Sequence, residues 1–199
     1  MNQKQLAMQL SKLVFVESKK VQLEQYQTDS EIAAEILWNA FMQGDVEDKS
    51  IADFGCGNGI LGIGALLLGA RKATLVDIDN NCINAANNNI KALKLKATLL
   101  NCDISKLQGR FDTVFQNPPF GTKKEHADRE FLLKAMESAD VVYSFHKSST
   151  ESFVNAVAKD NGFEVVNKWL FKFPIKHIFE FHKKRVYYAD VGCYRLVNK

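Results

Sequence analysis

The feature that most restricts the fold of this chain is the alternation of short β-branched segments with longer segments of helical apolar periodicity. Parallel strands need a crossover of a dozen or more residues between them, and helices supply it. The alternation therefore predicts an α/β fold with a doubly wound, mostly parallel, seven-stranded Rossmann-like sheet. The first five strands are expected at Ser50–Phe54, Ala73–Ile78, Ala97–Asn101, Phe111–Gln116 and Val141–Phe145.

The last two strands are predicted to pair differently. The aromatic-rich segments 163–173 and 185–196 leave no room for a crossover helix between them. They are expected to form an antiparallel C-terminal hairpin at the edge of the sheet. The segment 97–101 is expected to form an edge as well.

Residue types at the helix ends support this reading. Thr28 with Glu31, and Ser148 with Glu151, fit the capping-box pattern that starts a helix. Asp79 is expected to cap a third helix. Gly69 and Gly162 are expected to end the helices that precede them.

Length and composition limit the class of protein. The chain of 199 residues is 46% hydrophobic, which predicts a single domain over residues 1–199. Its longest apolar stretch, 59–70, is too short to cross a bilayer, and residues 1–10 carry no signal-peptide core, so no membrane association is expected. The four cysteines form no CxxC pair, so we expect no metal site and no disulfide framework, and a cytoplasmic location fits best.

A glycine-rich turn between the first strand and the following helix predicts a ligand site. Asp53 precedes three alternating glycines, Gly55, Gly57 and Gly59, and Asp77 ends the next strand 20 residues after Gly57. Glycines let a ligand approach the backbone, and an acidic side chain at this distance can hold ribose hydroxyls. A nucleoside-containing ligand is therefore expected. An ordinary glycine turn is the alternative, and the loop also fits the GxGxxG pattern of dinucleotide-binding proteins.

The fourth strand runs directly into Asn117, Pro118, Pro119 and Phe120. Neither proline has an N–H group, so the Asn117 side-chain oxygen and the Pro118 carbonyl are expected to act as hydrogen-bond acceptors. Two acceptors suit a planar amino group such as the N6 of adenine, and Phe120 offers a face on which the base can stack. These four residues are the predicted catalytic group. A simple Pro-Pro turn is the alternative.

Basic residues concentrate toward the C-terminus, where residues 141–199 contain ten Lys and Arg against five Asp and Glu. His146, Lys147 and Ser148 lie where the fifth strand gives way to a helix and could contact a phosphate, although His146 also fits a structural role. Basic residues among aromatics favour looped RNA, although lysines that protect a sheet edge are an alternative. The loop 121–129 is expected to fold over a flipped-out base. The other predicted RNA-binding residues are Lys123, Lys124, Lys183, Lys184 and Arg185.

The chain resembles the methyltransferase-like five family of small-subunit ribosomal RNA adenine-N6 methyltransferases, which use S-adenosylmethionine. The Asn-Pro-Pro-aromatic part of the resemblance is shared with glutamine and guanine amino-methyltransferases, so it indicates the chemistry rather than the substrate. The similar segments are Leu23–Thr28, Ala52–Gly59, Val76–Asp79, Asn117–Lys123, Tyr143–Thr150 and Phe181–Lys184.

The resemblance implies roles for individual residues. Gln25 and Thr28 would close over the cofactor, and Asp77 would hold its ribose. Gly55, Asn58 and Ile60 would line the methionine end, and Asp103 with the backbone of Ile104 would contact the adenine. Gln27 and Asn58 depart from the family, which commonly has Pro and often has Cys at these positions. The resemblance also implies a small zinc-binding activator protein docked on the third-strand edge.

The leading hypothesis is therefore an S-adenosylmethionine-dependent N6-adenine methyltransferase that acts on ribosomal RNA. A protein glutamine N5-methyltransferase is an alternative, because a glutamine side chain presents the same planar nitrogen. A non-catalytic RNA-binding module that retains the cofactor fold is another.

Overall fold

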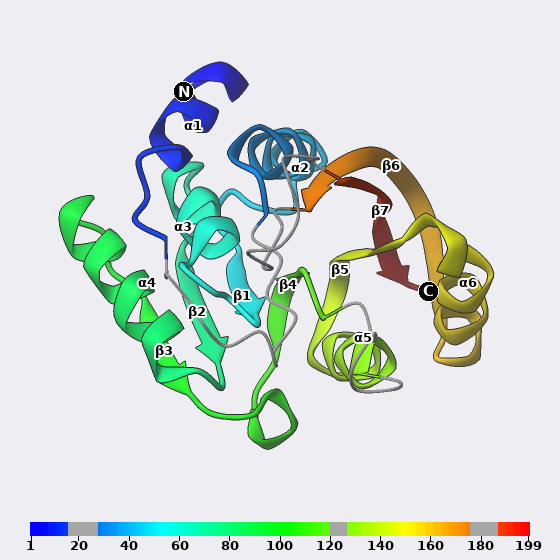
Figure 1. The fold of residues 1–199 in the computed structure, drawn as a ribbon. Helices are drawn as coiled ribbons and strands as arrows, with labels where there is room; N and C mark the ends of the chain where they lie inside the picture. Colours follow the sequence, from blue (N-terminus) through cyan, green and yellow to red (C-terminus); the bar gives the residue numbers. More distant parts are fainter. Residues whose placement is uncertain (16–27, 120–126, 176–186) are drawn as a thin grey trace, which may run out of the picture.

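The computed structural model describes residues 1–15, 28–119, 127–175 and 187–199. Seven strands form one sheet in the order β3-β2-β1-β4-β5-β7-β6 (Figure 1). The first five strands of the chain pair in parallel, and β7 pairs antiparallel with both β5 and β6. The strands are β1 (Ser50–Phe54), β2 (Lys72–Asp77), β3 (Thr98–Asn101), β4 (Phe111–Gln116), β5 (Ala139–Lys147), β6 (Phe163–Ile175) and β7 (Tyr187–Asn198).

Helices cover both faces of the sheet (Figure 1). Helices α1 to α4 contribute to one core layer, and α5 and α6 contribute to the other. The expected doubly wound, mostly parallel fold with an antiparallel C-terminal hairpin is confirmed. The helices are α1 (Gln3–Leu10), α2 (Ser30–Met42), α3 (Ile60–Leu67), α4 (Asn80–Ala92), α5 (Ala127–Ser138) and α6 (Glu151–Asp160), with the 3₁₀ turns η2 (Ile104–Lys106) and η3 (Ser148–Thr150).

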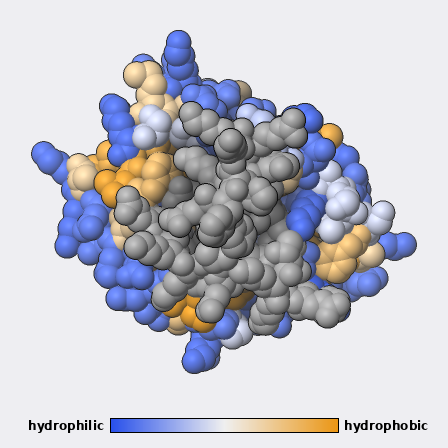
Figure 2. Space-filling view, in the orientation of Figure 1, coloured by the Kyte–Doolittle hydropathy of each residue, from blue (hydrophilic) through white to orange (hydrophobic). Residues whose placement is uncertain are grey.

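The two core layers follow from the alternation of side chains along each strand. On β5, Tyr143 and Phe145 pack toward α1–α4, whereas Val142 packs toward α5 and α6. Figure 2 shows that the described surface on this side of the molecule is mostly hydrophilic, with hydrophobic residues in separate small patches. No helix in the described part of the chain is long and apolar enough to cross a membrane.

Two helix starts differ from the prediction. The N-cap of α2 is Asp29, whose carboxylate accepts from the N–H groups of Glu31 at 2.9 Å and Ile32 at 3.4 Å. A carboxylate is a strong cap beside the positive end of the helix dipole, so the predicted Thr28 capping box is wrong. The predicted Ser148 box is wrong as well, because Ser148 opens the turn η3 and α6 begins only at Glu151.

Three other helix ends agree with the prediction, and two further features differ from it. Asp79 caps α4 through the N–H of Asn81, and Gly69 and Gly162 follow α3 and α6 with positive φ, as expected. Helix α1 was not predicted, although Asn2 and Gln5 form a complete capping box at its start. The predicted loop 121–129 is too long at its C-terminal end, because α5 begins at residue 127.

A buried ion pair joins the segment before β1 to strand β7. Asp45 accepts hydrogen bonds from Arg195 Nε at 2.7 Å and from Tyr143 Oη at 2.7 Å. Its backbone carbonyl accepts from Thr113 Oγ1 at 2.7 Å. The Asp45 and Arg195 side chains are only 9% and 15% exposed. This network therefore connects the segment before β1 with β4, β5 and β7.

Removal of this carboxylate is expected to destabilise the protein strongly. Asp45→Asn leaves the buried Arg195 guanidinium without its counter-charge, and the expected loss is about 3–5 kcal/mol in the free energy of unfolding measured with urea. The exposed pair of Asp140 with Arg110 provides the control, because Asp140→Asn should cost less than about 1 kcal/mol. Equal effects of the two substitutions would contradict this role of Asp45.

Candidate active site

The glycine turn follows β1 and leads into α3 with an unusual backbone. Gly55, Gly57 and Gly59 have φ angles of 67°, 55° and 87°, in the left-handed region that glycine adopts without strain. A Cβ atom added to Gly57 would meet none of the described residues within 4 Å, so these residues leave space above this part of the turn. A Cβ atom on Gly59 would lie 2.8 Å from Leu75. The turn therefore combines a tight approach to the sheet with room for a ligand.

Asp77 holds the turn from the end of β2. Its Oδ2 atom accepts from the N–H of Gly57 at 2.9 Å, and its Oδ1 atom accepts from the N–H of Asp79 at 2.8 Å. Burial raises the pKa of this carboxyl, while both N–H groups act in the opposite direction. Each oxygen of a carboxylate has capacity for a second hydrogen bond, so the same group can still accept from two vicinal hydroxyls.

Asp53 lies below the turn and is only 1% exposed. Its Oδ2 atom accepts from the N–H of Gly62 at 2.8 Å, which fixes α3 to the end of β1. Burial raises the pKa of Asp53 to about 7, and the nearby carboxylate of Asp77 adds to the increase. The position of Asp53 indicates that it supports the turn from inside rather than touching a ligand.

The raised pKa of Asp53 predicts a pH dependence of stability. The unfolded chain ionises this carboxyl near pH 3.8, whereas the folded protein retains the proton up to about pH 7. Stability should therefore fall as the pH rises between these values and level off above about pH 7. Relative to Asp53→Asn, the wild-type protein is expected to lose about 2 kcal/mol of unfolding free energy between pH 5 and 7.

Urea unfolding at a series of pH values measures this difference. Asp112 is a suitable control, because hydrogen bonds from Ser50 lower its pKa. The stability that Asp112 adds is lost only as the pH falls through that lowered value, so Asp112→Asn should shift stability uniformly between pH 5 and 7. A uniform shift for Asp53→Asn as well would disprove the assignment.

The sheet register brings the Asn-Pro-Pro turn beside the glycine turn. Phe54 at the end of β1 is paired with Val76 on one side and with Gln116 on the other. Gly55 and Asn117 therefore follow adjacent strands, at the end of the sheet where the carboxyl ends of the parallel strands lie. Parallel strands place such residues in the crevice where ligands bind in doubly wound folds.

Asn117 is held in a defined orientation by Thr28. The Nδ2 atom of Asn117 donates to Thr28 Oγ1 at 3.0 Å, across 89 positions in the sequence. Thr28 is 5% exposed, and Asn117 is half-buried. Because the amide nitrogen points to Thr28, the amide oxygen is the atom of this group that can accept a hydrogen bond. The structure thus joins one residue predicted to cover the cofactor to one predicted to be catalytic.

The other predicted cofactor residues surround the same edge. Asn58 and Ile60 are buried, at 6% and 4% exposure. Asp103 caps the turn η2 by accepting from the N–H of Ser105 at 2.9 Å, and Ile104 follows it with 8% exposure.

His146 lies in the core rather than on the surface. It is 1% exposed, and its Nε2 atom is 2.7 Å from Ser144 Oγ, which accepts from Gln116 Nε2 at 2.9 Å. Burial lowers the pKa of His146 to about 3, so its imidazole is neutral at physiological pH. This position provides no surface for a phosphate contact and favours the structural alternative.

The remaining basic residues are only partly described. Lys147 and Ser148 are half-buried at the end of β5. In the hairpin, Lys168 forms an ion pair with Glu151 at 2.7 Å, and Lys172 forms one with Asp190 at 3.5 Å. The predicted residues outside the described part of the chain are Gln25, Phe120, Lys123, Lys124, Lys183, Lys184 and Arg185.

Some residues at this edge were not predicted. Ile78 lies between two buried aspartates and is 61% exposed, which is unusual for an isoleucine. Asn101 Nδ2 donates to the carbonyls of Asp77 and Ile78, both at 3.0 Å. An apolar residue directly after Asp77, the aspartate predicted to hold the ribose, is the signal that could have indicated Ile78. Asn101 has no local sequence signal, because its partners come from another strand.

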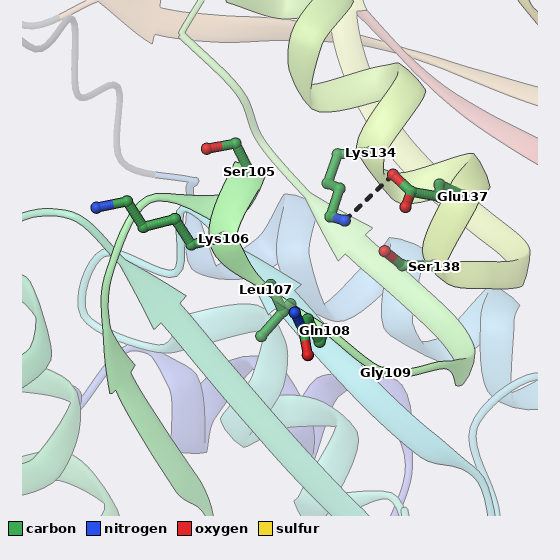
Figure 3. A pocket seen from close by; sticks show the side chains of 8 residues that line it. All are labelled: Ser105, Lys106, Leu107, Gln108, Gly109, Lys134, Glu137 and Ser138. Atoms are coloured by element: carbon green, nitrogen blue, oxygen red, sulfur yellow. Dashed lines mark hydrogen bonds and ion pairs between the residues drawn. The ribbon is translucent and has the colours of Figure 1, made fainter.

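A separate polar pocket of about 390 Å³ lies between η2 and the end of α5 (Figure 3). Lys134 and Glu137, which form an ion pair at 3.1 Å, project at its wall. Its lining contains none of the predicted site residues. The lining residues are Ser105, Lys106, Leu107, Gln108, Gly109, Lys134, Glu137 and Ser138.

Comparison with known proteins agrees with this geometry. The family model described as "Methyltransferase small domain" matches residues 26–140, which include both turns at the sheet edge. The chain belongs to the methyltransferase small domain family.

Individual relatives of this chain match it over nearly its whole length. The rRNA N(6)-adenosine-methyltransferase METTL5 of Danio rerio is 36% identical, and the alignment covers 93% of each protein. A crystal structure from Pyrococcus horikoshii, described as that of a candidate RNA methyltransferase, has a TM-score of 0.92 and 40% identity and covers 100% of this chain and 98% of that one.

A more distant structure shares the fold. The magnesium protoporphyrin IX methyltransferase of Synechocystis, solved with bound SAM, has a TM-score of 0.67 at 19% identity, over 84% of this chain and 78% of that one.

Proposed function

We propose that this protein is an S-adenosylmethionine-dependent methyltransferase that modifies the N6 atom of an adenine in small-subunit ribosomal RNA. The observation that carries the proposal is the pairing of the glycine turn with an oriented Asn117 amide at the ends of two adjacent strands. The Danio rerio relative is named an rRNA N(6)-adenosine-methyltransferase, which supports ribosomal RNA adenine as the substrate.

The residues at the sheet edge fit this cofactor. The described residues leave space above Gly57 for its methionine portion, and the two oxygens of Asp77 suit the two ribose hydroxyls. We propose that Asp103, the backbone of Ile104 and the exposed face of Ile78 bind the adenine ring. When bound, S-adenosylmethionine supplies an electrophilic methyl group on a sulfonium centre.

The protein's own contribution is to orient the accepting amine. The Asn117 oxygen and the Pro118 carbonyl would each accept one hydrogen of the adenine amino group, which directs the nitrogen lone pair toward the methyl group. The same oxygens stabilise the positive charge that develops on this nitrogen. The methylated nitrogen then releases one proton to solvent, so no side chain has to act as a general base. Phe120, outside the described residues, would stack on the base.

The substrate would approach over basic residues. We propose that Lys147 and Ser148, with Lys123, Lys124, Lys183, Lys184 and Arg185, contact the RNA backbone. The solvent-facing edge of β3 would receive the small zinc-binding activator, since an unpaired strand edge with half-buried Leu99 and Leu100 can pair with another chain. Four free thiols suit the reducing cytoplasm, which is the proposed location.

Labelled methyl transfer tests the substrate class. The protein is incubated with methyl-labelled cofactor and with either small-subunit ribosomal RNA or a glutamine-containing peptide of the release-factor type. We expect label in the RNA and none in the peptide. Label in the peptide alone would support the glutamine alternative, and label in neither would support the non-catalytic one.

A further inference from the structure

Asn89 on α4 links three segments that are far apart in the sequence. Its Oδ1 atom accepts from the N–H of Val14 at 2.8 Å. Its Nδ2 atom donates to the carbonyl of Val14 at 3.0 Å and to the carbonyl of Asn58 at 3.0 Å. The side chain is 3% exposed. Both ends of this amide are therefore used in hydrogen bonds to backbone groups.

A buried asparagine in a helix requires a specific reason. Asparagine favours the helix less than alanine does, and burial of its amide is costly unless the amide is hydrogen-bonded. Its neighbours on the buried side of α4, Ala86 and Ile90, are apolar. The three hydrogen bonds to Val14 and Asn58 explain why an amide occupies this position.

These bonds hold the backbone at Val14 against the glycine turn. The Val14 side chain is 64% exposed and that of Phe15 is 42% exposed, so apolar burial does not fix the chain at these two residues. Asn89 pairs with both the N–H and the C=O of Val14, as a neighbouring strand would. Asn58 adds a longer contact from its own Nδ2 atom to the same carbonyl at 3.4 Å.

We propose that Asn89 is a positioning residue for cofactor binding, an inference that rests on the proposed function. It holds the carbonyl of Asn58 and the backbone of Val14 together, and so keeps the glycine turn in the form that receives the methionine end of the cofactor. Asn89 acts through these two residues and does not itself touch the cofactor.

Two substitutions test this role. Asn89→Ala removes the amide and keeps the helix, whereas Asn89→Asp keeps the shape and one acceptor but turns an oxygen toward two carbonyls. Asn88→Ala and Asn88→Asp are the matched controls, because Asn88 is exposed one position earlier on the same helix. Affinity for S-adenosylhomocysteine is measured by calorimetry, and amide hydrogen exchange at Val14 is measured by NMR.

Both Asn89 variants are expected to bind S-adenosylhomocysteine about tenfold more weakly, with faster exchange at Val14. Turnover at saturating cofactor should remain within about twofold of wild type, since the acceptor residues are unchanged. The Asn88 controls should match wild type. Melting temperatures verify that each variant is folded. If one Asn89 variant does not fold, the affinity of the other Asn89 variant tests the proposal.

Two outcomes would separate the hypotheses. Wild-type affinity in a folded Asn89 variant would overturn the positioning role and leave the proposed function intact. A loss of turnover at saturating cofactor as large as the loss of affinity would do the same. Absence of any binding by the wild-type protein would overturn the proposed function itself, and the inference with it.

Discussion

Asn117→Ala is expected to slow methyl transfer to RNA by about 100- to 1,000-fold, because the substitution removes one of the two acceptors proposed to align and stabilise the reacting amine. Affinity for S-adenosylhomocysteine should change by less than about twofold, since Asn117 is proposed to contact the accepting amine rather than the cofactor. Single-turnover kinetics and calorimetry measure the two effects separately.

Asn155→Ala is the control for this prediction, because Asn155 is an exposed asparagine on α6 whose side chain donates locally to the carbonyl of Glu151. Its rate should equal that of wild type. Substantial methylation by Asn117→Ala would show that the amide is not needed for the chemistry, and would favour a binding role for the whole site.

Asp77→Ala should weaken binding of S-adenosylmethionine by about 100-fold. The substitution removes both proposed ribose acceptors, and it also frees the N–H groups of Gly57 and Asp79 that the carboxylate now fixes. Hydrogen bonds to a charged group are each worth about 1.5–3 kcal/mol, so loss of the set accounts for an effect of this size.

Calorimetric titration with S-adenosylhomocysteine provides the measurement for Asp77→Ala. Asp160→Ala, at an exposed position that ends α6, is expected to bind like wild type. Unchanged affinity in a folded Asp77→Ala protein would mean that the ligand does not lie against the end of β2.

The order of elements could be predicted because it depends on local patterns. Strands β1 and β4 were predicted with their observed bounds, since alternating apolar residues and the flanking turns define them. The position of Asn117 beside the glycine turn followed from the usual strand order of a doubly wound sheet, and the register confirms it.

Other features depend on contacts that no local pattern encodes. Strand β5 continues to Lys147, two residues beyond its predicted end, because its residues 141–147 pair with β7. His146 is therefore still inside the sheet, opposite Gly192, and its side chain is buried. Thr28 fits a capping pattern, but its hydroxyl accepts from Asn117, which lies 89 positions away after the end of β4. The same reason explains why Asn89 was not predicted.

The most direct test of the central claim is mass spectrometry of nucleosides from small-subunit ribosomal RNA after incubation with S-adenosylmethionine and either wild-type protein or Asn117→Ala. Each reaction is run with and without a small zinc-binding activator protein. N6-methyladenosine is expected with wild-type protein, and almost none is expected with the variant. Absence of N6-methyladenosine from every wild-type reaction, or equal amounts from both proteins, would contradict the claim.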